Sequence, residues 1–134
     1  MTENFSAAEK AAMRARAKEL KETQDGEKAI QEAFKKMTPA DRALAKKIDA
    51  LVRMAAPGLM PKTWYGMPAY ANSDGKVVCF FKNAGKFKTR YSELGFNEPA
   101  KLDSGGMWPT VFAVTKLSPA EEAKIAKLVK QAVK

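Results

Sequence analysis

The stretch that decides the fold of this chain is Trp64-Tyr65-Gly66-Met67-Pro68-Ala69-Tyr70. It is followed by the turn sequence Asn72-Ser73-Asp74-Gly75 and by the apolar run Val77-Val78-Cys79-Phe80-Phe81. Gly66 and Pro68 disfavour a helix, because glycine is flexible and proline lacks a backbone donor. Asp74-Gly75 directly before an apolar run is a hairpin signal. The segment therefore predicts the start of a small antiparallel sheet.

Helical patterns precede this β region. Ser6 and Glu9 have the spacing of a capping box at the start of an Ala-, Lys- and Arg-rich helix over residues 7–22. We expect residues 23–26, which end in glycine, to break that helix. A second short helix is then predicted over residues 27–37.

Two further helices are predicted from caps and apolar stripes. One begins after Thr38, with proline at its first position, and ends at Pro57-Gly58. The other begins after Ser118, again with proline first. We expect both to pack on the same face of the sheet through Leu44, Ile48, Leu51, Ile125, Leu128 and Val129.

Four strands are expected, over residues 62–65 with a continuation at 69–71, and over 76–82, 86–92 and 108–115. In the third of these, alternation would place Lys86, Lys88 and Arg90 on one face, opposite apolar and aromatic neighbours.

Together these elements predict an α+β fold, with an antiparallel sheet of about four to five strands covered on one face by helices. The weakly apolar residues 1–25 are expected to form an N-terminal helical extension. Residues 26–134 then form a single domain, a size that can bury a core without metals or disulfides.

The composition argues against an enzyme. The chain has no histidine, which removes the commonest general base and most zinc sites. Its one cysteine, Cys79, lies in an apolar run and is expected to be a buried core residue rather than a nucleophile. No catalytic residue, metal site or cofactor is predicted.

The aromatic bend supplies the first candidate site. Trp64, Tyr65, Met67 and Tyr70 are candidate ligand-binding residues, because pockets are often lined by a few such side chains beside a bend. The alternative, weighted equally, is that the aromatic residues only pack the sheet.

A basic span supplies the second candidate site. The net charge is +9, and residues 76–90 carry five cations and no acid. The candidate anion-binding residues are Lys82, Lys86, Lys88 and Arg90. The alternative, which we favour about two to one, is that these side chains keep the protein soluble and protect a sheet edge.

The unpaired cysteine is typical of a reducing compartment, which predicts a cytoplasmic location. No apolar segment approaches the roughly 20 residues that a membrane helix needs, so no membrane association is expected. The N-terminus lacks the basic and apolar regions of a signal peptide.

At Tyr65-Gly66-Met67-Pro68-Ala69-Tyr70, with Gly75-Lys76 and the strand after it, the chain resembles the YdhG-like bacterial family of unknown function. The resemblance runs from about Thr38 to Lys134 and implies a frataxin-like sandwich. Some relatives are described as iron chaperones, which implies a role in binding or delivery. Iron chaperones of this shape use an acidic ridge, whereas this chain is basic, so no metal ligand is carried over.

Two functions therefore stand as hypotheses. The first is a non-enzymatic binding or delivery domain of the YdhG-like family, whose ligand or protein partner contacts the bend from Tyr65 to Tyr70. The second is a basic module for an anionic ligand, a nucleic acid or an acidic protein. Salt dependence separates them, since phosphate contacts weaken steeply with salt.

Overall fold

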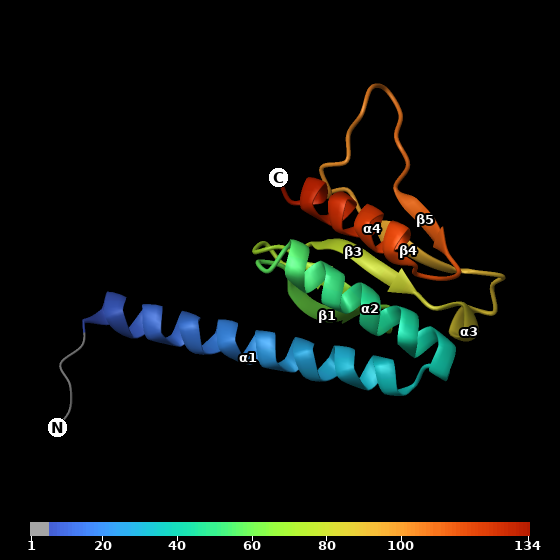
Figure 1. Ribbon diagram of the computed structural model, residues 1–134. Helices are drawn as coiled ribbons and strands as arrows, with labels where there is room; N and C mark the ends of the chain where they lie inside the picture. Colours follow the sequence, from blue (N-terminus) through green and yellow to red (C-terminus); the bar gives the residue numbers. More distant parts are fainter. Residues whose placement is uncertain (1–5) are drawn as a thin grey trace.

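The computed structural model describes residues 6–134 and contains one antiparallel sheet of five strands, which neighbour one another in sequence order (Figure 1). The strands are β1 (Met60–Trp64), β2 (Met67–Ala71), β3 (Val77–Lys82), β4 (Ser92–Phe96) and β5 (Val111–Val114). The helices in this range are α1 (Ala7–Lys35), α2 (Pro39–Ala55), α3 (Ala84–Phe87) and α4 (Pro119–Ala132). The predicted α+β class is confirmed.

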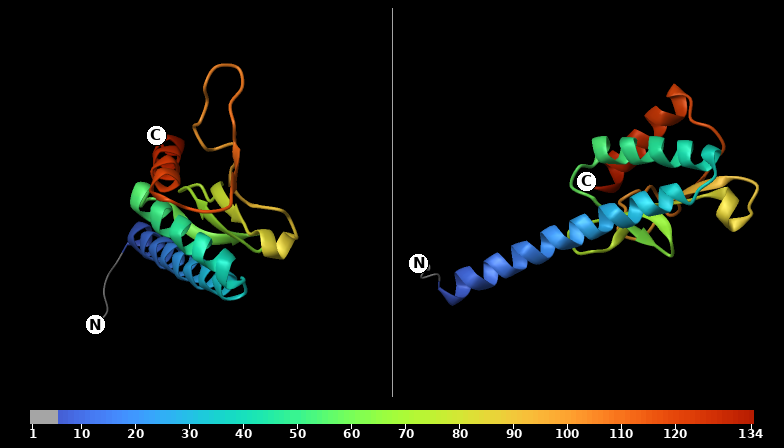
Figure 2. Two further views of the ribbon diagram at one scale, coloured as in Figure 1. Left: turned by 45° about the vertical axis from the view of Figure 1, so that its right-hand side comes forward. Right: turned by 90° about the horizontal axis from the view of Figure 1, so that it is seen from below.

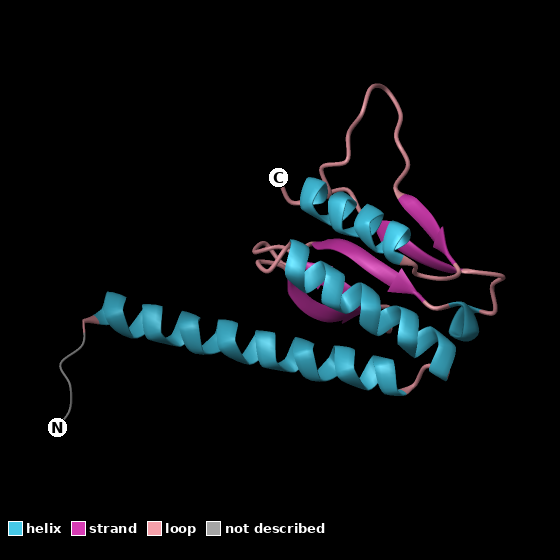
Figure 3. Cartoon of the chain, viewed as in Figure 1, coloured by secondary structure: helices cyan, strands magenta, loops and turns pink. Residues whose placement is uncertain are grey.

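The three long helices lie on one side of the sheet (Figures 2 and 3). Both predicted apolar stripes face the sheet, with Ile48, Leu51, Ile125 and Val129 buried and with Leu44 and Leu128 half-buried against the same core. Hydrophobic burial between these two layers is the main stabilising contribution. Within residues 6–134, no long helix covers the other face of the sheet, which leaves it open.

The predicted break at residues 23–26 is wrong, because α1 is one continuous helix. Gly26 lies where α1 crosses β1 so closely that a Cβ atom there would be 2.2 Å from the carbonyl oxygen of Pro61. Glycine costs a helix about 1 kcal/mol relative to alanine. Here its small size lets the two backbones touch. The proposed limit between the extension and the domain falls inside α1.

The hairpin predicted at Asp74-Gly75 is present, whereas the expected continuation of strand 62–65 into residues 69–71 is wrong, because the chain reverses at Tyr65-Gly66. β1 and β2 are joined by Tyr65-Gly66 alone, and both residues have positive φ, 51° and 75°. Positive φ at both positions is typical of the two-residue turns whose twist matches that of the flanking strands. The next hairpin is closed by Asn72, whose Oδ1 accepts hydrogen bonds from the N–H groups of Asp74 and Lys76.

The strand predicted over residues 86–92 is wrong. The chain instead forms the short helix α3, and β4 begins only at Ser92. The cause is a tertiary contact with the buried Asp41 of α2, whose Oδ2 accepts a hydrogen bond from the Gly85 N–H at 2.8 Å. Ser92 Oγ accepts a second one, from the Ala84 N–H.

The last strand is shorter than the predicted 108–115. β5 spans Val111–Val114, and residues 97–110 form a long loop that projects beyond the sheet (Figure 1). In the part of the chain that is described, no helix has the length and apolar character needed to cross a membrane.

Candidate binding surface on the open face of the sheet

The open face of the sheet is defined by the strand register. Residues that lie directly opposite each other on neighbouring strands point to the same face. One such row crosses all five strands and consists of Lys62, Ala69, Phe80, Gly95 and Val111. Trp64 also points to this face, because it is two residues beyond Lys62 on β1.

Aromatic rings lie together on this open face. The ring centroids of Trp64 and Phe80 are 5.0 Å apart, and those of Trp64 and Tyr65 are 4.8 Å apart in an edge-to-face arrangement. Phe80 lies across Gly95, where a Cβ atom would be 2.2 Å from the ring. The missing side chain of Gly95 therefore gives the Phe80 ring room to lie against the sheet.

Two lysine side chains also belong to this surface, through contacts with the ring of Phe87. The Nζ atoms of Lys82 and Lys86 both lie 5.3 Å from the ring centroid of Phe87, within the range of a cation–π contact. Lys86 Nζ also lies 3.5 Å from the carbonyl oxygen of Tyr65. We refer to the connected residues as the aromatic–lysine cluster, which consists of Trp64, Tyr65, Phe80, Lys82, Lys86 and Phe87.

The charge of this cluster is not neutralised internally. Neither Lys82 nor Lys86 forms an ion pair with any residue between 6 and 134. Glu93 is opposite Lys82 in the strand register, yet the two side chains make no ion pair. Two ammonium groups that share one aromatic ring favour an anion that can contact both.

The predicted aromatic candidates divide between the two faces of the sheet. Trp64 and Tyr65 belong to the cluster, and Tyr65 is 79% exposed. Met67 is buried, although it points to the open face opposite Trp64. Tyr70 is 1% exposed and points to the helices, so for this candidate the alternative of a packing residue holds.

The four predicted anion-binding residues also separate into two groups, one inside the cluster and one outside it. Lys82 and Lys86 enter the cluster, and both contact Phe87. Lys88 has a left-handed conformation at the end of α3, and Arg90 lies over the ring of Tyr91. The expectation that Lys86, Lys88 and Arg90 share one strand face is wrong, because the segment from Ala84 to Phe87 is helical.

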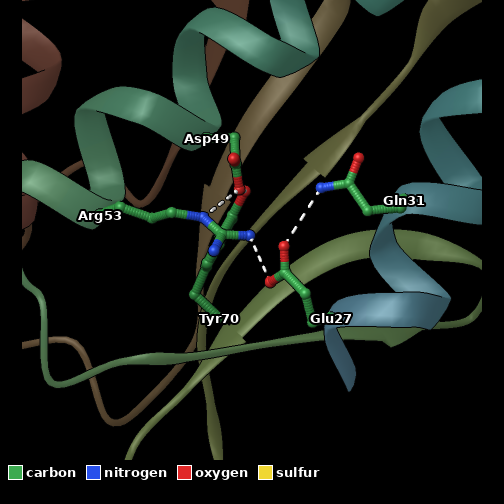
Figure 4. A network of polar contacts seen from close by, with 5 residues as sticks. All are labelled: Glu27, Gln31, Asp49, Arg53 and Tyr70. Atoms are coloured by element: carbon green, nitrogen blue, oxygen red, sulfur yellow. Dashed lines mark hydrogen bonds and ion pairs between the residues drawn. The ribbon is translucent and has the colours of Figure 1, made fainter. Parts of the chain in front are cut away.

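Tyr70 belongs to a polar network between the helices and the sheet (Figure 4). Its hydroxyl donates to Asp49 Oδ1, which also accepts a hydrogen bond from Arg53 Nε at 3.0 Å. Arg53 Nη2 donates to Glu27 of α1 at 2.8 Å. Burial and the Asp49 carboxylate raise the pKa of Tyr70 far above its ordinary value, so the phenol stays neutral and structural.

Cys79 is fully buried, as predicted. Burial raises the pKa of its thiol to about 12, so the reactive thiolate does not form near neutral pH. Among residues 6–134, no three side chains of His, Cys, Asp or Glu form a group that could hold a metal ion.

Two members of the cluster, Phe80 and Phe87, were not predicted as site residues. Phe80 is part of an apolar run that is typical of a buried strand. Strand alternation could have identified it, because Cys79 and Phe80 must point to opposite faces. Phe87 could not be identified in this way, since its position depends on the α3 contact with Asp41.

Comparison of this chain with family models, curated proteins and solved structures found no match.

Proposed function

We propose that this protein is a non-enzymatic, cytoplasmic binding domain of the YdhG-like type, and that its ligand is an anion held by the aromatic–lysine cluster. The observation that carries the proposal is the convergence of Lys82 and Lys86 on Phe87, with Lys86 also in contact with the backbone carbonyl of the exposed Tyr65. This joins the two candidate sites of the sequence, the aromatic bend and the basic span, into one surface.

The charge of the surface favours an anion over a metal cargo. Lys62 and Lys82 point to the same face of the sheet as Phe80, Lys86 contacts Phe87, and the whole chain carries a net charge of +9. A hard cation would be repelled, whereas phosphate or carboxylate groups would be attracted from a distance. Delivery of an anionic ligand or partner is therefore a better fit to this chain than delivery of iron.

The geometry favours binding over catalysis. Two buried ionisable groups, Cys79 and Tyr70, have raised pKa values and face the core rather than the open face. The cluster offers ammonium groups and rings, which bind and orient a ligand. It brings no general base beside a nucleophile.

The proposal is tested with fluorescently labelled inorganic polyphosphate, using anisotropy at low and rising salt. The double variant Lys82→Ala/Lys86→Ala should lose affinity by about tenfold or more, because it removes two charge-assisted contacts. The double variant Lys127→Ala/Lys130→Ala, on α4, is the matched control with the same loss of charge. No binding at low salt, or equal losses in both variants, contradicts the proposal.

A further inference from the structure

We infer that the anion bound by the aromatic–lysine cluster is a single-stranded nucleic acid, whose bases stack on Tyr65 and Trp64 while its phosphates contact Lys82 and Lys86. This inference rests on the proposed anion-binding function and specifies its ligand. Single-strand binding proteins combine these same two elements, a positive track for the backbone and aromatic rings for the bases.

Tyr65 supports the stacking role. Its φ of 51° belongs to the left-handed region, which disfavours any side chain with a Cβ atom. Two-residue turns of this type usually contain Asn-Gly or Asp-Gly. Here the first position carries a large ring that is 79% exposed and contacts Trp64 only edge to face. The hairpin therefore presents an aromatic face to solvent at a position where a small polar residue would fit better.

The arrangement of the rings and cations supports a strand that runs along the cluster. Phe80, Trp64 and Tyr65 follow one another at centroid separations of 5.0 and 4.8 Å. Lys86 adjoins Tyr65, and Lys82 adjoins Lys86 through Phe87. The residue that carries the exposed ring, Tyr65, is thus in direct backbone contact with an ammonium group, an arrangement that suits a base and its phosphate.

An acidic protein or a polyphosphate would use the lysines but not the rings. A DNA duplex would also leave the rings unused, because its bases are already stacked on one another. Among residues 6–134, the helix that contributes to the cluster is α3, and its four residues are too few to lie along a major groove. The contribution of the rings therefore distinguishes the inferred ligand from the other anions.

The chain has two tryptophans, Trp64 and Trp108. The experiment therefore uses the variant Trp108→Phe, in which Trp64 is the sole tryptophan. Oligothymidylate is titrated against its fluorescence, in parallel with polyphosphate and a duplex of equal phosphate number. We expect saturable quenching by oligothymidylate only, and an affinity that falls with salt at a log–log slope of about −1.4 for two phosphate contacts.

In the same background, Tyr65→Asn should weaken oligothymidylate binding by about fivefold or more and leave polyphosphate binding unchanged. Tyr65→Phe, which keeps the ring, should retain the affinity. Equal affinities for polyphosphate and oligothymidylate, or oligothymidylate binding with no change of Trp64 fluorescence, overturns the inference and leaves the anion site intact. Binding of neither ligand overturns the inference and the proposed function together.

Discussion

The hydroxyl of Tyr70 donates a hydrogen bond of 2.6 Å to Asp49 Oδ1, and this bond joins the centre of the sheet to α2 (Figure 4). Arg53 extends the connection to Glu27 of α1. The long N-terminal helix is thus held to the domain by Gly26 against β1 and by this network. Tyr70 is therefore a structural residue of the core, although in the sequence it lies at the end of the aromatic bend.

Tyr70→Phe should lower the free energy of unfolding by about 1.5–3 kcal/mol, the usual contribution of a hydrogen bond to a charged group. The shape of the side chain is kept, so packing changes little. Urea unfolding at pH 7 measures the loss. Tyr91→Phe is the control and should change stability by less than about 0.5 kcal/mol, since the half-buried Tyr91 hydroxyl has no hydrogen bond within residues 6–134. Equal effects of the two variants would contradict the structural role of Tyr70.

Gly26→Ala should destabilise the protein, against the usual preference of helices for alanine. Helix propensity favours the substitution by about 1 kcal/mol. The new Cβ atom would lie 2.2 Å from the Pro61 carbonyl oxygen, and both backbones would have to move. Overpacking of this kind costs about 1–3 kcal/mol, so we expect a net loss. Thermal unfolding measures the change, and the exposed Gln24→Ala is the control. A stabilised Gly26→Ala protein would show that the close crossing is wrong.

The parts of the fold that follow from local sequence were predictable. These parts include the helix starts at Thr38 and Ser118, the apolar stripes of the two helices that follow, and the hairpin at Asn72. Each depends on residues within a few positions of each other. Two of the wrong elements depend on distant contacts. Gly26 stays helical against Pro61, and the turn at Gly85 is fixed by Asp41, which lies 44 positions earlier in the chain.

The candidate site was predictable to the same extent. Trp64 and Tyr65 were identified from the aromatic bend, and Lys82 and Lys86 were identified from the basic span. Strand parity also carried a signal that separates the faces, because Met67 and Tyr70 are three positions apart on one strand and must point in opposite directions. The meeting of Lys86 with Tyr65 was not predictable, since it requires the helical turn of α3.

The buried Cys79 predicts a loss of stability at alkaline pH. Its thiol has an ordinary pKa of 9.0, and burial raises this pKa to about 12 in the folded protein. Between these values the unfolded chain has released a proton that the folded chain retains. The free energy of unfolding therefore falls as pH rises from about 9 to 12, by about 1.4 kcal/mol per pH unit for this group.

Cys79→Ala removes this dependence, although the cavity that it leaves lowers stability at every pH. The quantity to compare is therefore the slope of the free energy of unfolding against pH. Urea unfolding at intervals from pH 8 to 11 should give the variant a shallower decline than the wild type above pH 9. The other alkaline titrations, including that of Tyr70, are present in both proteins and cancel. Parallel slopes would show that the thiol ionises equally in the folded and unfolded chains.

The positive φ of Tyr65 predicts the relative stabilities of variants at this position. Tyr65→Ala and Tyr65→Asn both remove the ring, which contacts Trp64. Asparagine tolerates the left-handed region, whereas alanine is strained there by about 1–2 kcal/mol. Tyr65→Asn should therefore unfold at a higher urea concentration than Tyr65→Ala. A glycine at this position should resemble asparagine. If alanine proved as stable as asparagine, the positive φ of residue 65 would be wrong, and with it the argument that the hairpin presents the ring of Tyr65 at a cost in stability.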